Sequence, residues 1–309
     1  MGARSPRSLD TPGPAPHPQP RVTSLLVGLD GSTAAQVALA QAILVGQRFR
    51  ARIVLAHVSP PPGKTGEMAL GAPWMEWTPG NAPVTRREHE DAAQLMLDDA
   101  AGAVRKAGLE VETAWRSGEI VEVLRELAEG VGVVVVGRSG MRTNGDPLGP
   151  DTRDLIRRSP RPVLVCGRRP TPMDRVMVAY GGGPASEGAL AFAGRFAGIL
   201  EAHLDVLHVS SDPESGRQTM ARASGALSRM PLDYDLHLVE GALEVVLPSM
   251  VETLQCNAVF AGAHREDAGW LVPSHTEVIL RATELPVLVH LQTTSPGARV
   301  SASYRRPAP

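Results

Sequence analysis

The chain has 309 residues, and its hydrophobic fraction of 43% and charged fraction of 21% are typical of a globular protein. This length is generous for a single hydrophobic core and favours two domains of ordinary size. The net charge of −2, without a block of basic residues, argues against a nucleic-acid partner. No apolar run approaches the ~18 residues of a membrane span.

Neither the chain ends nor the cysteines indicate secretion. Residues 1–20 are rich in Pro, Ser and Arg and lack the apolar core of a signal peptide, so we expect a disordered tail there and another at residues 292–309. Cys166 and Cys256 have no metal-binding spacing. Buried, reduced thiols are therefore favoured over a disulfide, which fits a cytoplasmic protein.

Strand and helix patterns alternate along the first half of the chain. Short apolar runs bounded by glycine or polar residues predict strands, and longer stretches with an apolar side predict helices. In chain order the predicted elements are a strand at 24–28, a helix at about 33–49, a strand at 53–59, a helix at about 85–107, a strand at 109–115, a helix at about 120–129, a strand at 133–136, a helix at about 151–159 and a strand at 163–165. This alternation is typical of an open parallel sheet with helices on both faces.

The same pattern then begins again. Residues 176–180 match the first strand, 187–200 the first helix, 204–210 the second strand and 286–289 the closing strand. Because Pro170 and Pro172 suit a short stiff linker, we place one domain at residues 21–168 and the other at residues 174–291. The sequence thus predicts an α/β protein of two tandem doubly wound, Rossmann-like domains, each a five-stranded parallel sheet with helices on both faces.

The stretch 131–166 offers the clearest chemistry. Its four consecutive valines at 133–136 are followed by Gly137, Gly140, a polar loop, Gly149 and a helix. Glycines between a buried strand and a helix start let backbone N–H groups approach a phosphate at the positive end of the helix. The stretch therefore predicts a phosphate-binding loop.

Taken together, the chain resembles the universal stress protein family over residues 21–291. The features that carry the resemblance are a first strand ending at Asp30-Gly31-Ser32, second strands ending in His57-Val58 and His208-Val209, the run 133–140, and the closing strands at 162–165 and 286–289. The resemblance implies a five-stranded doubly wound fold that holds ATP in some members and no nucleotide in others. Nucleotide-binding members are marked by G-x2-G-x9-G-[ST] and by an Asp that closes the first strand.

By this resemblance the first domain would bind ATP, with or without Mg²⁺. Asp30, in the turn with Gly31 and Ser32, would reach the adenosine part, and Val58 would line the adenine or ribose. The phosphate cradle would be shaped by three glycines, Gly137, Gly140 and Gly149. These positions suit the fold, because ligands of an open α/β sheet lie outside the carboxyl ends of its strands.

The first domain departs from the family pattern in two ways. Eight residues rather than nine separate Gly140 from Gly149, and Pro150 stands where Ser or Thr is expected. Pro150 removes an N–H donor, and Asp151 adds a carboxylate near the phosphates. Residues that could compensate with positive charge or a hydroxyl group are Arg138, Arg142, Arg153 and Thr152. A nucleotide site and an empty or altered pocket both remain open.

The second domain departs further. Gly181 stands in the place of Asp30, and Gly262-Ala263-His264-Arg265 in the place of residues 137–140. We therefore expect no ATP in this domain. The three glycines at 181–183 could bind an anion at a helix N-terminus, but a tight turn explains them equally simply.

Other polar residues have both a structural and a functional interpretation. Asp30 and Ser32 also suit a turn and a helix N-cap. For His57 and His208, a place in the core or a bond to a backbone carbonyl is favoured over catalysis. Trp74 and Trp77 could cover the pocket or merely pack on the domain.

A possible metal site is disfavoured. Asp233, Asp235 and His237 alternate on one face of a predicted strand, but no further ligand is apparent. We expect a solvated sheet face there, and no metal.

We therefore expect a cytoplasmic stress-response regulatory protein whose first domain binds ATP or a related nucleotide. The second domain would be its structural partner, paired through the closing strands as an intramolecular pseudo-dimer, and the whole chain could also form a homodimer. The alternative is a nucleotide-free interaction or adaptor protein of the same family. A slow ATPase is less favoured, because no P-loop, nucleophile elbow or H-E-x-x-H motif supplies catalytic residues.

Overall fold

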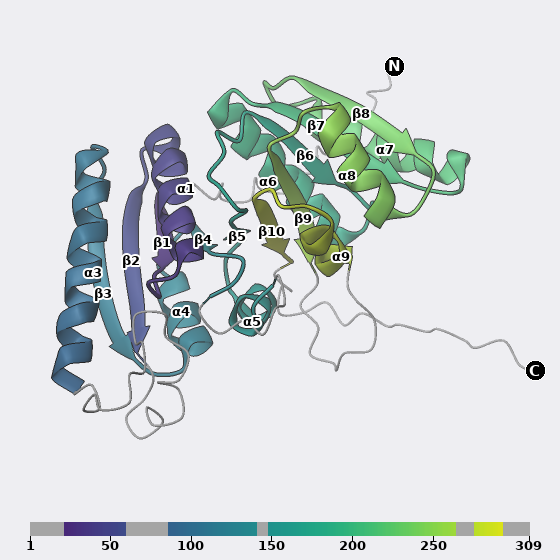
Figure 1. Ribbon diagram of the computed structural model, residues 1–309. Helices are drawn as coiled ribbons and strands as arrows, with labels where there is room; N and C mark the ends of the chain where they lie inside the picture. The colour runs from purple at the N-terminus through teal and green to yellow at the C-terminus, as the bar shows by residue number, and fades with distance from the viewer. Residues whose placement is uncertain (1–21, 60–85, 141–147, 264–274, 293–309) are drawn as a thin grey trace, which may run out of the picture.

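A computed structural model describes residues 22–59, 86–140, 148–263 and 275–292 of the protein (Figure 1). The described elements are β1 (Ser24–Gly28), α1 (Thr33–Phe49), β2 (Arg52–Ser59), α3 (Arg86–Lys106), β3 (Val111–Ser117), α4 (Ile120–Ala128), β4 (Val133–Val136), α5 (Pro150–Arg158), β5 (Val163–Val165), β6 (Arg175–Ala179), α6 (Pro184–Leu200), β7 (His203–Val209), α7 (Pro213–Leu227), β8 (Tyr234–Val239), α8 (Leu243–Thr253), β9 (Ala258–Ala263), α9 (His275–Ala282) and β10 (Val287–Leu291). The predicted tails, except Gln292, and the segment with Trp74 and Trp77 lie outside the described residues, as does Arg142.

The described strands form one sheet in the order β3-β2-β1-β4-β5-β10-β9-β6-β7-β8. Neighbouring strands are parallel within each domain, whereas β5 and β10 pair antiparallel, with Val165 opposite Val287 and Val163 opposite Val289. The sequence predicted two five-stranded sheets, and the structure joins them into a single sheet. In the first domain the chain order switches between β1 and β4, which is where ligands of such sheets bind.

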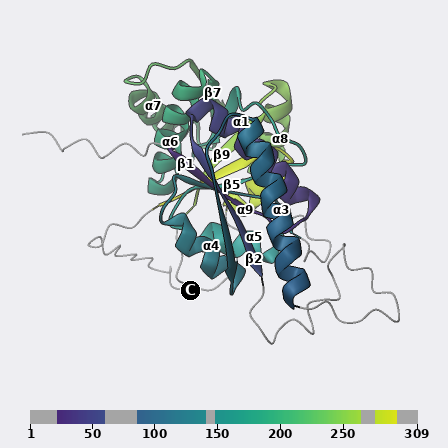
Figure 2. The ribbon, with the colours of Figure 1, turned by 90° about the vertical axis from the view of Figure 1, so that its left-hand side faces the viewer.

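Helices cover both faces of this sheet, which confirms the predicted doubly wound α/β architecture. Helices α1, α3, α6 and α7 pack on one face, with Leu97 and Phe192 in the core beneath them. Helices α4, α5, α8 and α9 pack on the other, with Leu155 and Leu280 in the core. Figure 2 shows α3 and α4 on opposite sides of β2. Among the described helices, none has both the length and the apolar composition to cross a membrane.

The two domains also meet through side chains. Phe49 at the end of α1 lies against Phe196 of α6, with 4.8 Å between ring centroids. The chain has four phenylalanines, and the other two, Phe192 and Phe260, surround Phe196 at 6.1 and 5.1 Å. An apolar contact of this kind ties α1 of the first domain to α6 of the second.

Candidate functional site

The turn after β1 is built by Asp30, Gly31 and Ser32. The Asp30 carboxylate accepts the backbone N–H of Ser32 at 3.0 Å, and the Ser32 hydroxyl accepts the N–H of Ala35 at 3.1 Å, which caps α1. Gly31 has a φ of +81°, a conformation that favours glycine. The structural interpretation of Asp30 and Ser32 as a turn and an N-cap is thus confirmed, and it leaves the Asp30 carboxylate half-buried at the carboxyl end of β1.

Asp30 and Gly140 lie together across the switch between β1 and β4. A Cβ atom added to Gly140 would lie 2.7 Å from Oδ2 of Asp30. Position 140 must therefore be glycine, or the carboxylate must move. The structure thus brings these two predicted site residues close together.

Gly137 has a packing role that the sequence did not predict. A Cβ atom at Gly137 would lie 2.7 Å from Cβ of Ala34 and 2.8 Å from its backbone carbon. In the second domain Gly262 is as close to Ala185, with 2.2 Å to the carbonyl oxygen. Because the domain that lacks Asp30 keeps this contact, close packing of strand on helix explains the glycine without a phosphate.

Two further predicted residues use their polar groups within the protein. The Thr152 hydroxyl donates to the carbonyl of Gly137 at 3.2 Å, just as Thr276 donates to Gly262 at 3.0 Å in the second domain. The N–H of Gly149, at the start of α5, donates to the carbonyl of Arg138 at 3.1 Å. Neither group is placed as a donor to a phosphate.

The Arg138 side chain extends to the second domain. Its guanidinium donates to the carbonyl of Leu285 at 3.0 Å and to that of Leu280, both in the second domain. Burial lowers the pKa of Arg138, while the nearby carboxylate of Glu284 acts in the opposite direction. The Arg138 guanidinium therefore makes a contact between the domains, and the direction of this side chain could not be predicted from the sequence.

Arg153 also faces the second domain. Its Nη2 atom lies 3.7 Å from Oε1 of Glu277 in α9, and its side chain is 23% exposed. Of the basic residues expected to compensate for Pro150, the two that are described both contact the other domain.

A cavity of about 220 Å³ opens beside the N-termini of α4 and α5. Its lining residues are mostly acidic: Glu119, Ile120, Val121, Glu122, Asp151, Asp154 and Arg158. The four carboxylates repel a bare polyphosphate, although Glu122 is paired with Arg125 and Arg158, and Asp154 with Arg157. A bound Mg²⁺ would reduce that repulsion.

Val58 and the matched histidines lie near the ends of the second strands. Val58 is half-buried against the core under α4 and α5, so it can line an apolar surface. His57 Nδ1 lies 2.8 Å from the carbonyl oxygen of Leu29, and His208 Nδ1 lies 2.8 Å from that of Tyr180. The prediction that both histidines bind backbone carbonyls is confirmed.

The second domain has no carboxylate in the place of Asp30. Its equivalent turn is held by Gly182, with a φ of +74°, against Arg222 and Thr219 of α7. The Tyr180 hydroxyl donates to Glu187, and burial raises the pKa of Tyr180. This turn is therefore filled by side chains of the protein itself.

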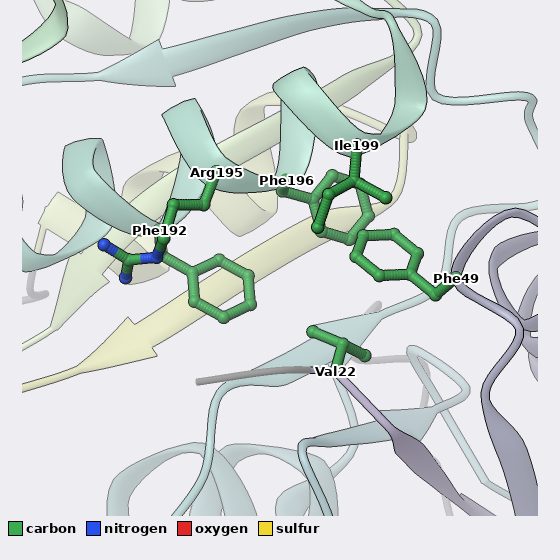
Figure 3. Close-up of a pocket in the computed structure, with 6 residues that line it drawn as sticks. All are labelled: Val22, Phe49, Phe192, Arg195, Phe196 and Ile199. Atoms are coloured by element: carbon green, nitrogen blue, oxygen red, sulfur yellow. The ribbon is translucent and has the colours of Figure 1, made fainter. Parts of the chain in front are cut away.

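A second cavity, between α1 and α6, cannot hold a ligand. It measures about 10 Å³, room for about one water molecule. Figure 3 shows the residues around it, Val22, Phe49, Phe192, Arg195, Phe196 and Ile199.

Comparisons with known proteins agree with this architecture. Residues 22–167 and 172–290 both match the universal stress protein family. A universal stress protein from Archaeoglobus fulgidus DSM 4304 is similar, with a TM-score of 0.69 at 17% identity over 88% of this chain and 99% of that chain. A functionally unknown protein from Pseudomonas aeruginosa PAO1 has a TM-score of 0.59 at 20% identity, over 88% of this chain and 93% of that chain. At such identities the likeness shows the fold alone, and none of the curated proteins compared with the chain matches it.

Proposed function

The chain belongs to the universal stress protein family as a tandem of two family domains, and from this we propose a regulatory protein whose first domain binds ATP or a related nucleotide. The nucleoside would lie at the switch between β1 and β4, with Asp30 facing its ribose and Val58 its apolar side. The second domain would serve as the structural partner of the first.

The observation that carries this proposal is the position of the Asp30 carboxylate over Gly140. A carboxylate at the carboxyl edge of a doubly wound sheet can accept two ribose hydroxyl hydrogen bonds, and charged acceptors make the stronger bonds. The glycine opposite leaves room for it. The second domain lacks the carboxylate and has filled the space, so only one nucleotide per chain is proposed.

The polar contacts favour recognition of the nucleoside over that of the phosphates. The donors predicted for the phosphates are used elsewhere, at Thr152, Gly149 and Arg138. The neighbouring cavity is acidic. We therefore expect adenosine to bind about as tightly as ATP without Mg²⁺, and Mg²⁺ to strengthen the binding of ATP only.

Isothermal titration calorimetry of the full chain with adenosine, ATP and ATP plus Mg²⁺ tests the proposal. Loss of a hydrogen bond to a charged group costs about 1.5–3 kcal/mol, so Asp30→Ala should weaken all three ligands about tenfold to a hundredfold. Gly140→Ala should weaken them too, because its Cβ displaces the same carboxylate. Asp99→Ala, which removes an exposed carboxylate from α3, serves as the control and should bind like the wild type.

A different outcome would support the second candidate, a nucleotide-free interaction protein. That candidate is favoured by Pro150 at the first position of α5 and by the acidic cavity beside it. No heat of binding by the wild type at millimolar adenosine and ATP would leave it as the better account. Equal binding by the wild type and Asp30→Ala would place the nucleotide elsewhere.

Three further expectations stay predictions. Both cysteines are buried and outside any disulfide, which is compatible with the cytoplasmic location that we propose. Pairing of the two domains in solution can be tested by amide hydrogen exchange at β5 and β10, and homodimerisation of the chain by light scattering.

A further inference from the structure

A cluster of histidines and carboxylates lies on the sheet of the second domain, apart from the site at Asp30. Its centre is Asp205 of β7, whose side chain is fully buried at 0% exposure. His203 precedes it on the same strand, and Asp235 and His237 lie on β8 alongside. The sequence pattern indicated Asp235 and His237 without a further ligand. His203 and Asp205 could not be added, because β7 becomes the neighbour of β8 only in the folded sheet.

The Asp205 carboxylate is held firmly from one side. Arg175 of β6 donates to both of its oxygens, from Nε to Oδ2 at 2.8 Å and from Nη2 to Oδ1 at 3.1 Å. The Cys256 thiol lies 3.5 Å from Oδ2. Such outer partners fix the orientation of a ligating carboxylate.

Three possible ligand atoms lie close together around Oδ1 of this carboxylate. His203 Nε2 lies 3.7 Å from Asp205 Oδ1 and 3.1 Å from Asp235 Oδ2, and the three atoms all lie within 4.8 Å of one another. A tetrahedral ion with bonds of about 2.0–2.1 Å has ligand atoms about 3.3–3.4 Å apart. The two distances from His203, 3.7 and 3.1 Å, lie on either side of this value, and the third separation is at most 4.8 Å.

The charges of the cluster also point to a cation. Asp205 and Asp235 are directly opposite each other on neighbouring strands, where two like charges repel. Arg175 pairs with Asp205, at 2.8 Å between Nε and Oδ2. A cation between the two carboxylates would relieve this repulsion.

We propose that His203, Asp205 and Asp235 form a binding site for a divalent transition-metal ion such as Zn²⁺. Imidazole and carboxylate ligands together suit zinc and its first-row neighbours better than Ca²⁺ or Mg²⁺, which prefer oxygen ligands alone. The ion enters beside Asp235, whose side chain is 63% exposed. His237 Nε2 lies 2.8 Å from Asp205 Oδ1 and helps to orient this carboxylate.

Co²⁺ is the probe for the first experiment, because a tetrahedral Co²⁺ site absorbs visible light strongly. Chelator-treated, tag-free full-length protein is titrated with Co²⁺ and then with Zn²⁺. We expect saturation at one Co²⁺ per chain, visible bands, and loss of these bands as Zn²⁺ displaces Co²⁺. Zn²⁺ should also raise the midpoint of thermal unfolding, because it binds only the folded chain.

Asp235→Asn and His203→Gln test the ligands, and Asp233→Asn is the matched control. Asp233 is an exposed carboxylate just before β8 and lies outside the cluster. The first two variants should bind Co²⁺ at least tenfold more weakly and lose the Zn²⁺-dependent rise in unfolding temperature, whereas Asp233→Asn should keep both. If these residues formed only a structural network, the substitutions would change the unfolding temperature of the metal-free protein. Zn²⁺ would then have no effect on the unfolding temperature of the wild type or of the variants. The proposal is overturned if the wild type shows no Co²⁺ bands, or if Asp235→Asn binds as tightly as the wild type.

Discussion

At the scale of single residues, Gly137 and Gly262 occupy matched positions against the first turn of a helix. Added Cβ atoms would lie 2.7 Å from Ala34 in one domain and 2.2 Å from Ala185 in the other. Overpacking of this kind costs about 1–3 kcal/mol. We therefore expect Gly137→Ala and Gly262→Ala to lower the free energy of unfolding by that amount, measured by urea denaturation without nucleotide.

Gly102→Ala is the control for these two substitutions. Gly102 lies in α3, and an added Cβ atom there would meet nothing within 4 Å. Alanine in a helix interior is favoured over glycine by about 0.5–1 kcal/mol, so this variant should gain stability. If Gly137→Ala were as stable as Gly102→Ala, the packing explanation of Gly137 would be wrong.

The sequence could predict the position of the site residues better than the direction of their side chains. Asp30 and Gly140 come together because each follows a strand on either side of the switch, which the order of elements already indicates. Thr152 could not be assigned, because a hydroxyl can serve a ligand or a neighbouring carbonyl equally well. In the structure the Thr152 hydroxyl donates a hydrogen bond to the carbonyl of Gly137.

At the scale of elements, Arg138 connects the loop after β4 with the end of α9. The carbonyl of Leu280 belongs to the last turn of α9, where carbonyl groups lack partners within the helix and a cation is favourable. Substitution by methionine leaves this carbonyl and that of Leu285 without a donor, which costs about 1–3 kcal/mol. We expect Arg138→Met to lower the free energy of unfolding and to speed amide hydrogen exchange at residues 280–285.

Two further substitutions are compared with Arg138→Met: Arg138→Lys at the same position, and Arg229→Met at a distant one. Arg138→Lys keeps the charge but loses the planar fork that reaches two carbonyls, so its effect should be intermediate. Arg229→Met replaces an exposed arginine and should change neither measurement. Exchange at residues 280–285 that is unchanged in Arg138→Met would contradict the role of this side chain.

The sequence predicts whether a segment is a strand or a helix more reliably than it predicts which elements pack beside it. The four valines of β4 predicted a strand covered on both faces, and all four are buried. The contacts of Asp205 could not be foreseen, because its partners come from β6, β8 and the segment before β9. Residues far apart in the chain meet there only because of the strand order.

At the scale of the whole molecule, Phe49 and Phe196 couple the two domains on the face covered by α1 and α6. Aromatic pairs contribute about 0.5–1.5 kcal/mol beyond the area they bury. A double-mutant cycle of Phe49→Leu and Phe196→Leu, followed by urea denaturation, should give a coupling energy in this range.

Leu44 provides the control for this cycle. It lies on the same helix as Phe49 and is 39% exposed, so Leu44→Ala combined with Phe196→Leu should show no coupling. Additive effects of Phe49→Leu and Phe196→Leu would mean that the ring contact does not join the domains energetically.

The reversal of strand direction between β5 and β10 determines which sites of the two domains lie on the same side of the sheet. Because the strands of the second domain run against those of the first, the carboxyl ends of one domain share a long edge of the sheet with the amino ends of the other. Asp30 follows β1 and His203 begins β7, so both belong to that shared edge. They are six strand positions apart, about 29 Å along the edge at about 4.8 Å per strand. If both proposed ligands bind, one partner protein that contacts this edge would meet both sites. Its affinity would then depend on the nucleotide and on the metal ion together.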